Sequence, residues 1–105
     1  MPAYVVVQLA IHDAQTYERY KQLAPPSIAK YGGRYLARGG ATQALEGVWE
    51  PPRFVLLEFP SVEQARAWWA SPEYVAAKAL RQASTHTMML LVEGLPDVPP
   101  GQGTP

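Results

Sequence analysis

Two segments of the chain, Tyr31-Gly32-Gly33-Arg34-Tyr35-Leu36-Ala37-Arg38-Gly39-Gly40 and Phe54-Val55-Leu56-Leu57-Glu58-Phe59-Pro60-Ser61, indicate its architecture. The first ends a helix at a glycine pair, because glycine adopts the left-handed conformation that closes helices. It then enters a strand that a second glycine pair interrupts. The second segment is an apolar strand that runs directly into a helix cap. Together they predict a chain in which strands and helices alternate.

Towards the N-terminus, residues 4–11 are rich in β-branched and aromatic side chains and predict a strand. Asp13 is placed to cap the following helix. The buried stripe of that helix is predicted to comprise Tyr17, Tyr20, Ala24, Ile28 and Tyr31. The pair Pro25-Pro26 predicts a kink or a break inside it. The next strand covers residues 34–38, and residues 41–46 are a candidate continuation beyond the glycine pair.

Towards the C-terminus, residues 47–52 predict a loop that carries Trp49, and residues 53–59 a strand. Ser61, with Gln64 three positions later, has the spacing of a capping box. Ser71 followed by Pro72 predicts a renewed helix start. The apolar stripe of this segment is expected at Val75, Ala76, Ala79, Leu80 and Ala83, and a last strand over residues 86–93.

The element order is strand–helix–strand twice over, which predicts an α+β ferredoxin-like βαββαβ sandwich with the first and third strands in the centre of the sheet. The length of 105 residues suits one domain, predicted over residues 1–95. Prolines and glycines in residues 96–105 predict a flexible tail.

Both faces of the two central strands are apolar. Val5, Val7, Leu9 and Ile11 oppose Tyr4, Val6 and Ala10 on one strand, and Val55, Leu57 and Phe59 oppose Phe54 and Leu56 on the other. Helices on one side of the sheet would leave the other side in water, where an apolar patch of this kind is unusual for a monomer. We therefore expect a homodimer through sheet faces.

Composition excludes several classes of function. Nine basic and nine acidic residues give a net charge of zero, so neither nucleic acid nor a membrane surface is expected as a partner. The chain has no apolar run long enough to span a bilayer and no signal-peptide pattern. It has no cysteine, hence no disulfide or thiolate chemistry. The lack of cysteine fits a cytoplasmic protein. No cofactor or metal is expected, because no motif for either is present.

The chain resembles the family called domain of unknown function 1330, a branch of the dimeric α/β-barrel superfamily. The resemblance runs from about Ala3 to Gly94 and rests on short motifs in order: Tyr31-Gly32-Gly33, Arg38-Gly39-Gly40, Gly47 with Trp49, Glu58-Phe59-Pro60-Ser61, Ala67-Trp68-Trp69, Ser71-Pro72-Glu73-Tyr74 and Val92-Glu93-Gly94. It implies a ferredoxin-like fold and a dimeric barrel but no established reaction. Superfamily relatives include monooxygenases, muconolactone isomerases and chlorite dismutases, so fold analogy does not select a chemistry.

Arg38 and Glu58 are the candidate catalytic pair, since they lie on strands expected to be neighbours and Glu58 interrupts an apolar strand. A carboxylate in that position must be paired, exposed in a cavity or protonated. As a site, Glu58 would act as general acid or base and Arg38 would orient it or bind an anion. The alternative is a structural ion pair at the end of the sheet.

Tyr74, Lys78 and Arg81 share one helix face by their spacing, and Tyr74 and Arg81 are candidate substrate-binding residues. The alternative is a solvated face with Tyr74 at its margin. Trp68 and Trp69 are about 100° apart on a helix, so one is expected to pack inward and the other to meet a cleft or a partner. Trp69 is the third candidate substrate-binding residue. The alternative is that the tryptophans serve only core or interface packing.

His12 and His86 lie near strand ends on opposite flanks of the chain and could serve as proton shuttles or haem ligands. No further ligand pattern accompanies them, so ordinary surface histidines are the favoured interpretation. The sequence thus predicts a dimer that binds a small anionic or aromatic metabolite between sheet and helices. Cofactor-independent isomerisation or monooxygenation is the enzymatic form of this hypothesis, and a non-catalytic ligand-binding or structural dimer is the alternative.

Overall fold

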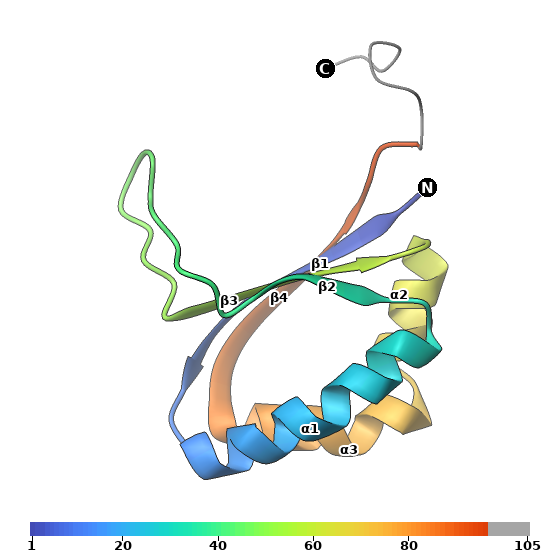
Figure 1. Ribbon diagram of the computed structural model, residues 1–105, viewed down its shortest axis with the longest axis horizontal. Coiled ribbons are helices and arrows are strands. Elements are labelled where there is room, and N and C mark those ends of the chain that lie inside the picture. Colours follow the sequence, from blue (N-terminus) through green and yellow to red (C-terminus); the bar gives the residue numbers. More distant parts are fainter. Residues whose placement is uncertain (97–105) are drawn as a thin grey trace.

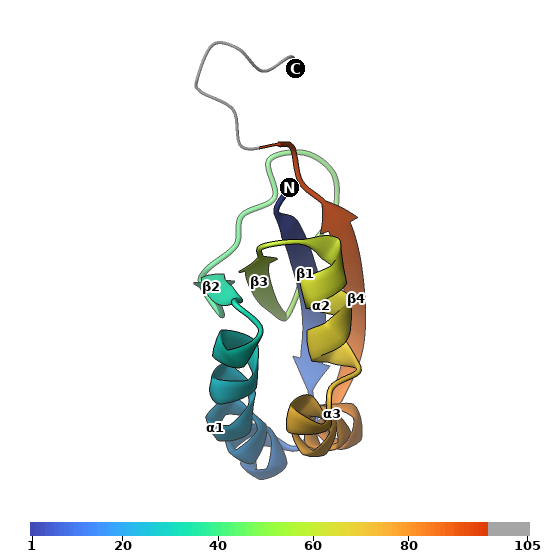
Figure 2. The same cartoon turned by 90° about the vertical axis from the view of Figure 1, so that its right-hand side faces the viewer.

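The computed structural model describes residues 1–96, which form one layer of helices on one antiparallel sheet (Figures 1 and 2). The elements are β1 (Ala3–Ile11), α1 (Ala14–Lys30), β2 (Arg34–Arg38), β3 (Arg53–Phe59), α2 (Val62–Trp69), α3 (Pro72–Ser84) and β4 (Thr85–Glu93). The strand order is β2-β3-β1-β4. The predicted α+β ferredoxin-like fold is confirmed, with β1 and β3 in the centre. The predicted tail, residues 96–105, lies outside the described residues except for Pro96.

Helix α1 begins and ends where its sequence predicts. The Asp13 carboxylate accepts a hydrogen bond of 3.2 Å from the backbone N–H of Thr16. At the other end Gly32 has a φ of +78°, and the N–H of Gly33 donates to the carbonyl of Ile28 at 2.9 Å, the bond that closes a Schellman motif. Of the kink or break expected at Pro25-Pro26, the break is wrong, because α1 continues through both prolines.

Strand β2 ends at Arg38 and lacks the continuation that the sequence suggests for it. Its register against β3 shifts between Tyr35 and Ala37, so Leu36 is the extra residue of a β-bulge. Gly39, with a φ of +71°, makes a last backbone bond to Phe54 and the chain then leaves the sheet. The candidate continuation over residues 41–46 is wrong, since those residues form no strand.

Two short helices follow β3, each started by a serine. The side chain of Ser61 accepts from the N–H of Gln64, and that of Ser71 accepts from the N–H of Tyr74, both at 3.1 Å. The predicted stripe of α3 is wrong, because Val75 is exposed. The buried residues of α3 are instead Tyr74, Ala77, Arg81 and Ser84.

The sheet has one covered and one open face. The covered face packs side chains of β1 and β3 beneath the helices: Ala3, Val5, Val7, Leu9, Val55, Leu57 and Phe59 are all buried. On the open face, Met88, Leu90 and Val92 of β4 are exposed, beside half-buried Val6 and Leu56. The expectation that both faces are apolar is confirmed. Within the described residues, the helices lack the length and apolar character needed to cross a membrane.

Candidate functional site

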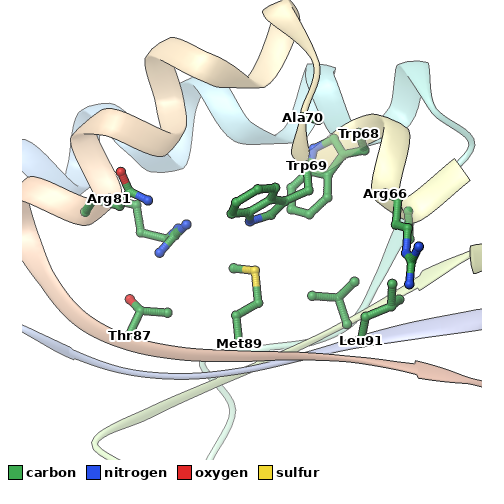
Figure 3. Close-up of a pocket in the computed structure, with 11 residues that line it drawn as sticks. Arg66, Trp68, Trp69, Ala70, Arg81, Thr87, Met89 and Leu91 are labelled. Atoms are coloured by element: carbon green, nitrogen blue, oxygen red, sulfur yellow. The ribbon is translucent and has the colours of Figure 1, made fainter. Parts of the chain in front are cut away.

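A cavity of about 570 Å³ lies between α2, α3 and the covered side of strand β4. Its volume is in the range of small-molecule sites. Figure 3 shows Trp69 entering it from the helices, with Met89 and Leu91 of β4 on the opposite wall. The lining consists of Val5, Ala65, Arg66, Trp68, Trp69, Ala70, Arg81, Gln82, Thr87, Met89 and Leu91. The walls are therefore chiefly apolar, with a few polar groups at defined places.

Arg81 supplies a buried positive charge at one end of this cavity. Its side chain is directed inward from α3, above Thr87 (Figure 3), and the residue is only 4% exposed. Its Nε donates a hydrogen bond of 3.2 Å to the hydroxyl of Tyr74, which lies 2.9 Å from the hydroxyl of Tyr20 on α1. These two hydrogen bonds hold the guanidinium in one place. The interpretation of Tyr74 and Arg81 as a solvated face is thus wrong.

The two adjacent tryptophans differ in burial, as the sequence predicts. Trp68 is fully buried, stacks on Tyr74 with 4.2 Å between ring centroids, and donates from Nε1 to Ser27 at 3.1 Å. Trp69 is 44% exposed and lines the cavity. The ammonium of Lys78 lies 3.8 Å from the centroid of the Trp69 ring, a cation–π contact that fixes the indole.

The charges on the cavity wall are all positive. Arg66 and Arg81 are the ionisable side chains among the lining residues, which include no carboxylate and no histidine. Each ion pair between described residues involves other groups, so Arg81 has no carboxylate within 4 Å in this part of the chain. Burial, and next the neighbouring Tyr74, raise the pKa of Tyr20 well above its ordinary value. The Tyr20 hydroxyl is therefore neutral and adds no negative charge near Arg81.

The predicted Arg38–Glu58 pair is wrong, because the two side chains lie on opposite faces of the sheet. Glu58 is on the open face, where its Oε1 accepts a bond of 2.9 Å from Nε of Arg34. Arg38 is opposite Val55 on the covered face and lies 4.5 Å from the Tyr35 ring centroid. The reason is the bulge at Leu36, since one extra residue reverses the alternation of side chains along a strand. Neither residue lines the cavity.

The two histidines are neighbours in space, although they are far apart in the sequence. His86 is the second residue of β4 and His12 directly follows β1, and their ring centroids are 5.2 Å apart. Both are exposed. Across residues 1–96 no group of three or more His, Cys, Asp or Glu side chains is arranged to hold a metal ion. The pair therefore adds no ligand set to the cavity described above.

Sequence reasoning missed the wall that β4 contributes. Thr87, Met89 and Leu91 alternate along that strand and face the cavity, and Tyr20 reaches its buried end through Tyr74. Alternation alone could have grouped the three β4 residues, but it does not say that α2 and α3 leave space above them. That space is a property of how the helices pack.

Solved structures share this fold. A protein of unknown function from Rhodopseudomonas palustris has a TM-score of 0.74 and 20% identity, covering 90% of this chain and 82% of its own. A dimeric ferredoxin-like protein of unknown function from Jannaschia has a TM-score of 0.62 and 16% identity over 90% and 100% of the two chains. SnoaB, a cofactor-independent oxygenase from Streptomyces nogalater, has a TM-score of 0.62 and 11% identity over 93% and 97%.

No functionally curated protein matches the chain. The structural neighbours share the architecture, and at these identities the likeness extends to the fold alone. The family assignment comes from the sequence itself, because the family model matches almost every described residue. The chain belongs to the family described as domain of unknown function DUF1330, which its residues 2–95 match.

Proposed function

We propose that this protein binds a small organic anion with a flat apolar body in the cavity between α2, α3 and β4. The observation that carries the proposal is Arg81, a buried guanidinium that faces the cavity without a carboxylate partner in the described part of the chain. A buried charge needs compensation, and an anionic ligand supplies it. A planar guanidinium suits a carboxylate or an enolate, which it can bind through two parallel hydrogen bonds.

The rest of the wall indicates the shape of the ligand. Trp69 presents an indole to the cavity, and Met89 and Leu91 form the opposite side (Figure 3). A flat ring or a conjugated chain fits between an indole and two aliphatic side chains, because aromatic faces stack well on both. Thr87 and Gln82 lie beside Arg81 and can hydrogen-bond the polar end of such a ligand.

The same features bear on whether the protein is an enzyme. SnoaB is described as a cofactor-independent oxygenase, and a guanidinium that stabilises an enolate or phenolate would serve that kind of reaction. Isomerisation needs a group that removes a proton, and the lining residues include no carboxylate or histidine for this purpose. The geometry therefore favours ligand binding, with oxygenation of an already ionised ligand as its enzymatic form.

The test is a pair of probe ligands that differ in charge. We expect 2-naphthoate to quench the tryptophan fluorescence and to bind at least about tenfold more tightly than neutral 2-naphthalenemethanol, a difference of about 1.4 kcal/mol. The variant Arg81→Met should lose this preference and Arg81→Lys should keep part of it. Arg34→Met, which removes an exposed arginine on the open face, is the matched control.

Thermal melts of each variant separate a lost site from a lost fold. Equal affinity of the two probes for the folded wild-type protein, or an undiminished preference in folded Arg81→Met, would contradict the proposal. A turnover assay with oxygen consumption then distinguishes binding from oxygenation, because only the latter consumes oxygen in proportion to ligand.

We further propose that the protein assembles as a homodimer through the open faces of its sheets. Met88, Leu90 and Val92 form an exposed apolar row beside Val6 and Leu56, and the Jannaschia protein is described as dimeric. Burying such a face contributes about 25 cal/mol per Å² before the cost of association. Leu90→Glu should give a monomer in light scattering, whereas Leu23→Glu, on an exposed position of α1, should leave the dimer intact. A wild-type monomer at micromolar concentration would overturn this.

A further inference from the structure

The connection between β2 and β3, residues 40–52, is an arm that leaves the sheet and projects away from the helices (Figure 1). It contains no helix or strand. Connections of this length without secondary structure are uncommon in compact domains and usually have a function. The arm contains two glycines, Gly40 and Gly47, and no serine, and more than half of its residues are apolar or proline: Ala41, Ala44, Leu45, Val48, Trp49, Pro51 and Pro52.

The outer part of the arm exposes large apolar side chains. Leu45 is 91% exposed and Val48 is fully exposed. Single exposed apolar residues are normal, but these two lie three positions apart at the tip of one segment and touch little of their own chain. Nothing in the described part of the molecule covers them.

The base of the arm is attached to the open face of the sheet. Trp49 donates from Nε1 to Oε1 of Gln8 on β1 at 2.7 Å, and its ring meets that of Phe54 edge-on with 6.2 Å between centroids. A hollow of about 260 Å³ remains between the arm and this face, lined by Thr42, Gln43, Ala44, Trp49, Pro51 and Phe54. The apolar surface of the arm is thus continuous with the face proposed above to form the dimer.

We infer that the arm is an embracing element that packs its tip, Leu45 and Val48, onto a second copy of this chain. The inference rests on the proposed homodimer. Its occupant is a second copy because the arm extends the sheet face and does not lie near the ligand cavity, whose lining residues include none from the arm. A two-fold axis would place the arm of each copy against the other, so the contact would be made twice.

A single thiol makes the arm observable, because the chain has no cysteine of its own. Val48→Cys is labelled with acrylodan, whose emission moves to shorter wavelength in apolar surroundings, and is diluted through the range in which the dimer dissociates. We expect short-wavelength emission in the dimer and a shift to longer wavelength on dilution. Labelled Ala29→Cys, exposed on α1, is the matched control and should not shift. Adding Leu90→Glu should leave labelled Val48→Cys in its long-wavelength state at every concentration.

A second variant measures the contribution to affinity. Val48→Glu should weaken dimerisation by at least about a hundredfold, because each dimer loses two buried valines that contribute about 1.5 kcal/mol each. The melting temperature of the monomer should be unchanged, since Val48 is fully exposed there. If the protein dimerises but neither the emission nor the affinity responds, the arm inference is wrong and the sheet-face dimer stands. If the protein is a monomer throughout, the proposed dimer is wrong and the inference falls with it.

Discussion

Arg38 donates a hydrogen bond of 3.0 Å from Nη2 to the backbone carbonyl of Lys21, the carbonyl that Pro25 leaves without its helical donor. In an α-helix the N–H of each residue bonds the carbonyl four positions earlier, and proline has no N–H. An arginine from β2 thus replaces the missing bond and ties the edge of the sheet to α1. The bond compensates for Pro25 inside α1, which continues through both prolines, and it gives Arg38 a structural contact with that helix.

Removing this bond should weaken the fold by a small amount that depends on Pro25. Arg38→Ala should lower the free energy of unfolding by about 1 kcal/mol in urea denaturation. In a Pro25→Ala background the loss should be smaller, because residue 25 then has an N–H for the carbonyl of Lys21. An equal loss in both backgrounds would show that the hydrogen bond to Lys21 is not what Arg38 contributes.

Ligand binding should depend on Trp69 and not on Glu58. Trp69→Ala should weaken 2-naphthoate binding about fivefold, since an aromatic contact contributes about 1 kcal/mol. Glu58→Gln should leave the affinity unchanged, because Glu58 pairs with Arg34 on the far side of the sheet. Calorimetric titration of both folded variants measures the affinities. If Glu58→Gln weakened 2-naphthoate binding more than Trp69→Ala, Glu58 would have to be part of the binding site.

The buried tryptophan should be sensitive to its hydrogen-bond partner. Ser27 accepts from Nε1 of Trp68 and donates to the carbonyl of Ala24 at 2.6 Å. Ser27→Ala leaves the indole N–H unpaired in the core and should cost about 1–3 kcal/mol of unfolding free energy. The same substitution is then made in a Trp68→Phe background. There Ser27→Ala should lower the free energy of unfolding by less, because no indole N–H remains to be left unpaired. An additive result in this cycle would rule out coupling between the two side chains.

Acid should remove one link between α1 and α3. Glu73 at the start of α3 accepts from Lys30 and from the Tyr31 hydroxyl, and the bond from Lys30, the largest cause, lowers the pKa of Glu73 from 4.5 to about 2. A carboxylate with a lowered pKa stabilises the fold above its unfolded value, and that stabilisation is lost as the pH falls from about 4.5 to about 2.

Glu73→Gln should therefore lower the melting temperature at pH 7 and have little effect near the lower end of that window. Thermal melts of both proteins across the acid range test this, with Glu63→Gln on the exposed side of α2 as control. A difference between wild type and Glu73→Gln that stays constant with pH would contradict the role of the charge.

The framework of this protein follows from local sequence. The caps at Asp13, Ser61 and Ser71 form because short oxygen-bearing side chains satisfy free N–H groups at helix starts. The glycine pair after α1 stops the helix because it admits a positive φ. These interactions join residues a few positions apart, so both partners can be identified in one short segment of sequence. The apolar character of both faces of β1 and β3 can likewise be read from the alternate positions along each strand.

The site was decided by contacts that no short segment contains. Arg81 and Tyr74 could equally have formed a solvated helix face, and they are buried because Tyr20 of another helix and the wall of β4 meet them. One inserted residue at Leu36 sends Arg38 and Glu58 to opposite sides of the sheet. Side-chain direction in a strand depends on register, and register is set by pairing with a distant strand, so only the folded chain could settle it.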